Sequence, residues 1–193
     1  METRREFLIG AAGAAALIAA GGAGRAFATE TELLRPPGGQ DEQSFFALCS
    51  RCYRCRTVCP EDIVVTATIE DGVLQARTPK LDFHRGYCTF CNKCIDVCPT
   101  GALVPFESSS ERIGTAVIDK NECLAYIRGA CDKCVDACIY GAITLNGQGL
   151  PVVDESACNG CGICEYACPS ASYGSYGGTK TRGINVLKGE GHA

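Results

Sequence analysis

The stretch CNGCGICEYACP, residues 158–169, decides the fold of this chain. It spaces four cysteines as C-x2-C-x2-C-x3-C and places a proline after the last one. The same pattern occurs as CSRCYRCRTVCP at 49–60 and CTFCNKCIDVCP at 88–99, and in a wider form, CLAYIRGACDKCVDAC, at 123–138. These stretches, motifs 1 to 4 in chain order, contain all sixteen cysteines of the 193 residues.

The spacing is typical of loops that bind [4Fe–4S] clusters. Three thiols two residues apart wrap around one face of a cubane, and the fourth thiol points toward a partner cluster. The prolines that follow, Pro60, Pro99 and Pro169, redirect the chain because proline cannot continue a hydrogen-bond ladder. We therefore predict four [4Fe–4S] clusters and no catalytic residue. The predicted iron ligands are Cys49, Cys52, Cys55, Cys59, Cys88, Cys91, Cys94, Cys98, Cys123, Cys131, Cys134, Cys138, Cys158, Cys161, Cys164 and Cys168.

Three other uses of the cysteines fit the pattern less well. Eight disulfides would suit an exported chain, but tight C-x2-C-x2-C runs are not spaced to join distant loops. Structural zinc uses pairs of C-x2-C, which leaves the third cysteine and the proline unexplained. Haem attachment requires a histidine after C-x2-C, and none of the motifs has one.

The first 28 residues indicate export. TRREFLIG at 3–10 carries two arginines before an apolar stretch, and AFA at 26–28 resembles a signal-peptidase site. The order TRREFL resembles the twin-arginine consensus, and a chance arginine pair before a general secretory signal is the alternative. The apolar stretch is short and rich in Ala and Gly, which disfavours a lasting membrane span. We predict a twin-arginine signal peptide at 1–28, but not whether it is removed or kept as an anchor.

Charge and composition exclude several function classes. Residues 1–28 hold three arginines and two glutamates, so the remaining chain keeps 15 of 18 basic and 20 of 22 acidic residues, a formal charge of −5. No basic run could follow a phosphate backbone, which argues against nucleic acid as a partner. The sequence has no nucleophile–base constellation, phosphate loop or nucleotide fingerprint, so we expect no enzyme activity of its own.

The remaining chain divides into a lead-in at 29–48, a four-cluster region at 49–175 and a tail at 176–193. We predict an α+β fold of two ferredoxin-like dicluster modules, in which small antiparallel hairpins and short helices surround the clusters. The apolar runs predict strands in 63–69, 101–106, 115–123, 141–145 and 150–158, an Asp71-Gly72 hairpin turn, and an edge strand in INVL at 184–187. Spacing alone does not decide whether the motifs pair in sequence or nested.

With these motifs in view, the chain resembles the NapG/MauM family of periplasmic ferredoxin-type proteins. The stretches that carry the resemblance are TRREFL, LRPPG, CSRCYRCRTVCP, CLAYIRGACDKC and CNGCGICEYACP. The resemblance implies nested pairing, motif 1 with 4 and motif 2 with 3. It also implies electron transfer at the outer face of the cytoplasmic membrane, from a membrane quinol-oxidising partner to a periplasmic oxidoreductase such as a nitrate-reductase-type enzyme, after export by the twin-arginine translocase.

The chain departs from that family at three places. Ile139 replaces the proline of motif 3, motif 2 lacks an insertion, and little chain follows Cys168. None of these removes a cysteine, so the cluster prediction is unaffected. Two further interpretations stay open: a subunit tightly bound to a molybdenum or other reductase or dehydrogenase, and a protein whose clusters are structural.

Charged residues near the motifs predict different reduction potentials. Arg51, Arg54 and Arg56 flank motif 1 and should raise its potential, or else form a docking patch for an acidic partner. The residue directly before the third cysteine is Lys93 in motif 2, Lys133 in motif 3 and Ile163 in motif 4. In motif 4, Glu165 directly follows that cysteine. We therefore expect the lowest potential at Cys158, Cys161 and Cys164, unless these side chains only face solvent.

We expect packing roles for Tyr53, Tyr87, Phe90, Tyr126, Tyr140 and Tyr166, and exposed, partnerless side chains for His84 and His192.

Overall fold

We analysed a computed structural model of the chain, which describes residues 32–170 and 182–189. The predicted signal peptide, His192 and most of the predicted tail lie outside these ranges. Within them, no helix is both long enough and apolar enough to cross a bilayer. The segment Thr68–Ala76 forms a unit apart from the body of the described chain, which comprises Glu32–Ala67 and the residues from Arg77 onward. The two units are therefore described separately.

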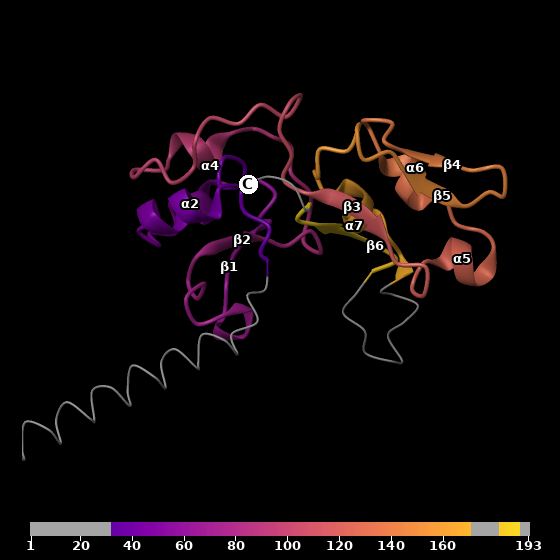
Figure 1. Ribbon diagram of the computed structural model, residues 1–193, viewed down its shortest axis with the longest axis horizontal. Helices are drawn as coiled ribbons and strands as arrows, with labels where there is room; N and C mark the ends of the chain where they lie inside the picture. The colour runs from indigo at the N-terminus through magenta and orange to yellow at the C-terminus, as the bar shows by residue number, and fades with distance from the viewer. Residues whose placement is uncertain (1–31, 171–181, 190–193) are drawn as a thin grey trace, which may run out of the picture. The chain divides into compact units, whose positions relative to one another are not determined.

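The body is an α+β structure of short elements, as the sequence predicts (Figure 1). Short helices alternate with two-stranded antiparallel sheets, which is the architecture of ferredoxin-like modules. The helices are α2 (Glu42–Leu48), α3 (Arg54–Val58), α4 (Lys93–Asp96), α5 (Leu124–Arg128), α6 (Lys133–Ala137) and α7 (Ile163–Ala167). The strands are β1 (Val64–Thr66), β2 (Pro79–Leu81), β3 (Thr115–Ile118), β4 (Ile143–Leu145), β5 (Pro151–Val153) and β6 (Ile184–Leu187).

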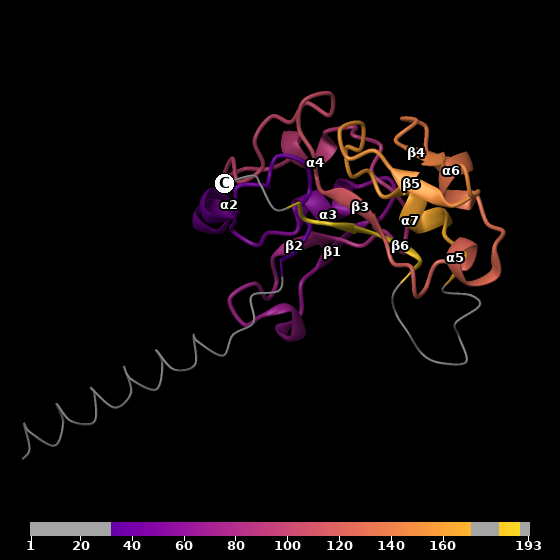
Figure 2. The ribbon, with the colours of Figure 1, turned by 45° about the vertical axis from the view of Figure 1, so that its right-hand side comes forward.

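Three sheets join the strands as β1–β2, β4–β5 and β3–β6. Their registers place Val64 opposite Leu81, Ile143 opposite Val153 and Ala116 opposite Val186. Val, Ile and Thr dominate these strands because branched side chains pack well on a pleated surface. The edge strand predicted in INVL is confirmed, since β6 pairs with β3 along its full length (Figure 2).

One predicted strand and one predicted tight turn are wrong. GALVPF at 101–106 forms no strand, because the amide of Val104 donates instead to the carbonyl of Gly38 in the lead-in at 3.0 Å. Asp71-Gly72 does not form a tight two-residue turn, although the flanking runs do pair as the antiparallel strands β1 and β2. In the separate segment Thr68–Ala76, a 3-10 helix, η1 (Ile69–Asp71), is closed by Asp71, whose carboxylate accepts from the amide of Thr68 at 2.7 Å. Asp71 therefore caps a short helix here and does not start a tight turn, because an aspartate side chain can accept hydrogen bonds from nearby backbone amides in either conformation.

The main core is shared by the two halves of the body. Ile63 and Phe83 come from the first half, and Ile113, Ile184 and Val186 come from the second. Cys134 and Cys164 are buried in this same cluster. The cysteine motifs are therefore built into the core rather than attached to its surface.

The lead-in is part of the core, although its composition predicts a polar segment. Arg35 is 2% exposed and ion-pairs with Glu42, while its guanidinium donates to the hydroxyl of Thr78 at 2.7 Å and the carbonyl of Pro79 at 2.8 Å. Its guanidinium also lies 4.8 Å from the ring centre of Phe45. These contacts hold the lead-in against the start of β2.

Candidate iron–sulfur cluster sites

The sixteen cysteines gather into four cavities with four thiols each. Each cavity contains the first three cysteines of one motif and the fourth cysteine of another. Site 1 has Cys49, Cys52, Cys55 and Cys98; site 2 has Cys88, Cys91, Cys94 and Cys59; site 3 has Cys123, Cys131, Cys134 and Cys168; site 4 has Cys158, Cys161, Cys164 and Cys138. The four cavities are alike in size, about 290 to 370 Å³ including the part open to solvent.

This grouping shows that the motifs pair in sequence order, and the expectation of nested pairing is wrong. Motif 1 exchanges its fourth cysteine with motif 2, and motif 3 does so with motif 4. The helices explain the choice: α3 packs against α4, and α6 packs against α7 (Figure 2). Because each fourth cysteine lies at or just beyond the C-terminal end of a motif helix, it enters the cavity of the helix that packs beside its own.

The motif loops share one backbone design. Motifs 1, 2 and 4 use two left-handed residues, one before and one after the second cysteine: Arg51 and Tyr53, Phe90 and Asn92, Gly160 and Gly162. The third cysteine is then the second residue of a short helix, as with Cys55 in α3 and Cys164 in α7. Cys59 ends α3 in an extended conformation that leads into Pro60, as expected for a residue before proline. The local backbone conformation of each loop thus directs the first three thiols of the motif into the same cavity.

Burial makes six of these thiols poor acids. Loss of solvation raises the pKa of Cys55 and Cys161 to about 11 and that of Cys88, Cys94 and Cys134 to about 12. Since a ligand must be a thiolate, filling these sites releases protons.

Two thiols of site 1 behave differently. The amide of Arg54 and the side chain of Ser50 lower the pKa of Cys52. For Cys98, partial burial alone would raise the pKa, but the amides of Leu103 and Thr100 outweigh it and the pKa is lowered. These two thiols therefore favour negative charge on sulfur, whereas Cys55 in the same site does not.

The cavities fit [4Fe–4S] clusters better than disulfides or zinc. All sixteen cysteines are free thiols in the structure. Among the described residues, no three His, Cys, Asp or Glu side chains converge on a single point where one ion could bind. Four thiols around one apolar cavity instead match a cubane, in which each thiolate binds a different iron.

Charged side chains are unevenly distributed over the sites. Arg51 and Arg54 line site 1, Lys93 lines site 2 and Lys133 lines site 3, whereas Ile163 occupies the corresponding place in site 4. This agrees with the positions expected from the sequence.

Glu165 does not face site 4. Its carboxylate is buried and accepts from the amide of Val186 in β6 at 2.7 Å. Burial raises the pKa of Glu165 and lowers the pKa of His84, whose Nε2 lies 3.4 Å from Oε1 of Glu165. The expectation that His84 lacks a partner is therefore wrong, because the fold brings β6 and the loop after β2 to α7.

The aromatic residues take different places. Tyr53, Tyr87 and Tyr140 line sites 1, 2 and 4. Phe90 stacks on Phe106 with ring centres 5.8 Å apart, in the core. Tyr126 and Tyr166 line none of the four sites; they lie instead beside Lys120 and Tyr87.

Sequence reasoning missed two hydroxyls. Thr100 lies 3.7 Å from the sulfur of Cys98 in site 1, and Ser170 lies 3.2 Å from the sulfur of Cys168 in site 3. Both follow the motif proline directly, so a C-P-S/T pattern could have revealed them. Hydroxyl contacts with a ligand sulfur are one way in which proteins adjust cluster potentials.

Comparison with known proteins agrees with this geometry. Two family models, each described as a 4Fe-4S dicluster domain, match residues 48–103 and residues 87–142 and 128–172. The chain is 36% identical over 155 residues to the methylamine utilization ferredoxin-type protein MauM of Methylophilus methylotrophus, covering 73% of this chain and 68% of that protein. The chain belongs to the NapG/MauM family of ferredoxin-type proteins.

Other members of the family match to a similar extent. Ferredoxin-type protein NapG of Escherichia coli (strain K12) is 37% identical over 152 residues, which is 70% of this chain. Ferredoxin-type protein NapF of the same strain is 32% identical over 143 residues, covering 80% of that protein. The chain spans 65% of the length of this NapG. Dicluster domains in this family indicate [4Fe–4S] cofactors in the present chain.

Proposed function

We propose that this chain is an electron carrier that holds four [4Fe–4S] clusters through its sixteen cysteines. The observation that carries the proposal is the exchange of fourth cysteines, which completes four thiols in each of four cavities. Such clusters supply one-electron transfer at potentials that their surroundings set. With four thiols per cavity, every iron of a bound cubane would have a protein ligand, and none would be open to a substrate.

The protein's part is to hold the thiols and to keep water away from the interior sites. Cys164 is 5% exposed and belongs to the main core, and Cys161 is 7% exposed. Cys52 and Cys91, by contrast, are exposed. This mixture suits a carrier, which needs thiols protected from water as well as sites near the surface.

The sites form a series. Sites 1 and 2 share motifs 1 and 2, and sites 3 and 4 share motifs 3 and 4. The two modules meet at sites 2 and 4, where the amide of Cys88 donates to the carbonyl of Cys161 at 2.7 Å. The order along the series is therefore site 1, site 2, site 4 and site 3, and sites 1 and 3 are terminal. A series supports a relay more than it supports structural clusters.

The setting of this relay follows from the sequence. Residues 1–28 form a twin-arginine signal, and that route carries folded proteins, so the chain would receive its cofactors before export. The layout is a lead-in at 29–48, the four-cluster region at 49–175 and a tail at 176–193. The family resemblance supports a periplasmic location, a membrane quinol-oxidising donor and a periplasmic oxidoreductase as acceptor.

A tightly bound subunit of a molybdenum or other reductase or dehydrogenase is the second candidate. A bound subunit stays with its partner enzyme, whereas a mobile electron carrier leaves it. Co-purification of a stoichiometric enzyme with the chain from its native cell would favour the subunit, and isolation of the chain alone would favour the mobile carrier.

The test is anaerobic purification followed by iron and sulfide analysis and EPR spectroscopy after reduction with dithionite. We expect about sixteen iron and sixteen sulfide per chain, with signals from interacting reduced [4Fe–4S] clusters. Zinc, or metal-free protein with disulfides, would refute the proposal. Cys98→Ser tests the exchange of cysteines, because it should remove the site 1 signal and spare site 2, although Cys98 belongs to motif 2.

A further inference from the structure

Site 1 has a basic surface in a chain that is acidic as a whole. Arg51, Arg54, Arg56 and Arg77 are all exposed or partly exposed, while the formal net charge of the chain is −4. Arg51 and Arg54 line site 1, and Arg56 directly follows its ligand candidate Cys55. No carboxylate is among the described residues around this cavity.

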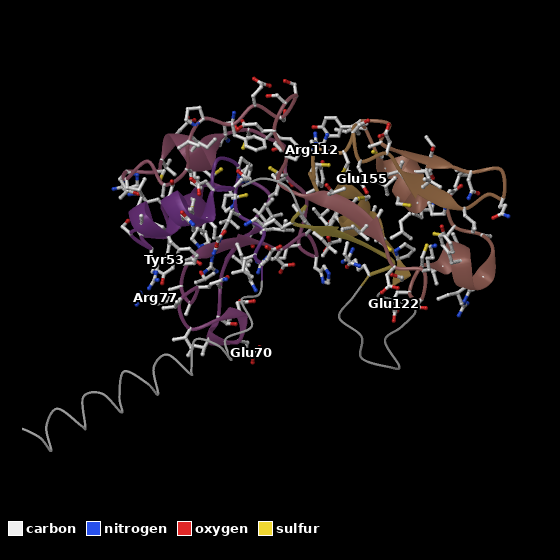
Figure 3. All side chains as sticks on the ribbon, viewed as in Figure 1. Tyr53, Glu70, Arg77, Arg112, Glu122 and Glu155 are labelled. Carbon is white, nitrogen blue, oxygen red and sulfur yellow. The ribbon has the colours of Figure 1, made fainter. Side chains whose placement is uncertain are left out.

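Arg77 joins this surface through Tyr53. Its Nε donates to the tyrosine hydroxyl at 2.7 Å, and its guanidinium lies 5.7 Å from the ring centre (Figure 3). Tyr53 itself lines site 1. Arg77 is far from motif 1 in the sequence, so only the fold assembles the fourth positive charge. We call Arg51, Arg54, Arg56 and Arg77 the arginine surface.

The shape beside the arginine surface is concave. An open hollow lies between α3 and α4, lined by Arg54, Val58, Asp96 and Cys98 among others. Arg54 and Cys98 belong to both this hollow and site 1. A segment of a partner seated in the hollow would therefore lie against site 1. Among the described residues that line it, Asp96 is the one carboxylate.

Site 3, the other terminal site, differs. Its lysine, Lys133, lies 3.2 Å from the carboxylate of Asp136 and 3.9 Å from that of Asp132. The positive charge of Lys133 is therefore balanced by neighbouring carboxylates. Among the described residues that line the two terminal sites, two arginines line site 1, and a lysine beside two carboxylates lines site 3, so the two ends present different surfaces to a partner.

We propose that the arginine surface and its hollow dock an acidic segment of a redox partner protein against site 1. This inference rests on the proposed electron-carrier function. Arginine suits the task because its planar guanidinium binds carboxylates in a bidentate manner. A concave surface fits a protruding protein segment rather than the plane of a lipid membrane. In the complex one electron passes between the partner's centre and the group at site 1, one being oxidised as the other is reduced, and no bond or proton is exchanged.

A redox-inert anion tests the surface without any turnover. Hexacyanochromate(III) is trivalent and paramagnetic, so it broadens the NMR signals of side chains near its binding place. We expect preferential broadening of the arginine Nε–H signals of Arg54, Arg56 and Arg77 in the cluster-loaded protein. The variant Arg54→Glu/Arg56→Glu should weaken binding of the anion about tenfold or more, because two attractions become repulsions. The matched control, Lys120→Glu/Arg128→Glu, makes the same change of charge on exposed residues near α5 and should keep the binding.

Electron exchange gives a second readout. The reduced protein is mixed with an anionic cobalt(III)–EDTA complex or with cationic hexaamminecobalt(III), each of which takes one electron to become cobalt(II). The arginine variant should slow oxidation by the anion about tenfold at low salt and leave oxidation by the cation equal or faster. The control variant should slow oxidation by the anion less than the arginine variant does.

The outcomes separate the two proposals. Iron content is measured on every sample, so low iron in the wild-type protein counts against the carrier and not against the surface. Broadening that is spread over all basic residues, or that follows Lys120 and Arg128, would overturn the docking surface. Binding to anionic phosphatidylglycerol vesicles that is lost with Arg54→Glu/Arg56→Glu would assign the surface to a membrane and also overturn it.

Discussion

Motifs 1 and 4 form the same cysteine loop in opposite surroundings. Arg51 and Gly160 occupy the same position, with φ of 55° and 76°, and Tyr53 and Gly162 occupy the next one, with φ of 64° and 80°. In motif 1 these residues reach solvent, whereas in motif 4 both positions are buried. A Cβ on Gly162 would lie 2.1 Å from the ring of Phe83, and one on Gly160 would lie 2.5 Å from the backbone of Gly114.

The comparison shows that the loop geometry and the residue choice have different causes. The left-handed turns are needed wherever three thiols wrap one cavity, and a non-glycine residue there costs about 1–2 kcal/mol. An exposed loop accepts that cost and gains side chains for recognition. A buried loop needs glycine for a second reason, because no space remains for a Cβ. Motif 1 is thus suited to contact a partner, and motif 4 is suited to support the core.

The largest effect should come from removing a thiol in the buried motif. The variant Cys164→Ser leaves site 4 with three thiols, and the missing one lies in the core. We therefore expect more than half of the iron to be lost and the protein to accumulate poorly. The matched variant Cys52→Ser removes an exposed thiol and should lose only about a quarter of the iron, one cluster of four. Iron analysis and EPR of both variants measure this. Equal losses would show that burial does not distinguish the two sites.

A smaller effect is expected from a single methyl group at the shared loop position. Gly160→Ala adds a Cβ against the backbone of Gly114 and a left-handed alanine, together about 2–5 kcal/mol. Arg51→Ala, at the same position of motif 1, adds neither. Thermal loss of the visible cluster absorption should therefore occur about 5–15 °C lower in Gly160→Ala and within a few degrees of wild type in Arg51→Ala. If both variants behave alike, the glycine is not required by packing.

Reduction potentials should differ between the two sites. We expect the lowest potential at site 4, which is buried and has Ile163 where the other sites have a cation, and a higher one at site 1, with its arginines and Thr100. Arg51→Gln/Arg54→Gln should lower the site 1 potential by on the order of 40 mV per charge. Conversely, Ile163→Lys should raise that of site 4. Redox titrations followed by EPR measure both, and a lowest potential at site 1 would contradict the assignment.

The smallest effect concerns the missing proline of motif 3. Cys138 is already extended, with φ −76° and ψ 95°, as a residue before proline must be, and the side chain of Ile139 is 74% exposed. Ile139→Pro should therefore stabilise the fold by about 0.4–1 kcal/mol, through a less flexible unfolded chain. Thermal denaturation measures the change. A clear loss of stability would mean that motif 3 needs a different path from motifs 1, 2 and 4.

The sequence alone determined the local chemistry of this protein. Cysteine spacing, the motif prolines and the positions of Lys93, Lys133 and Ile163 are local properties, and the structure places them as the motifs indicate. The α+β modules and the edge strand in INVL were also predictable, because short apolar runs bounded by turn residues usually form β-strands. Family membership followed from the same stretches.

Only the tertiary structure decided how these local units combine. Spacing is identical for sequential and nested pairing, and the packing of α3 on α4 and of α6 on α7 selected the first. Packing likewise buried Arg35 against the start of β2, brought Arg77 to Tyr53, and turned Glu165 away from site 4 toward β6. These contacts join residues that are distant in the chain. Their energies depend on which surfaces meet, and no local pattern of residues encodes that choice.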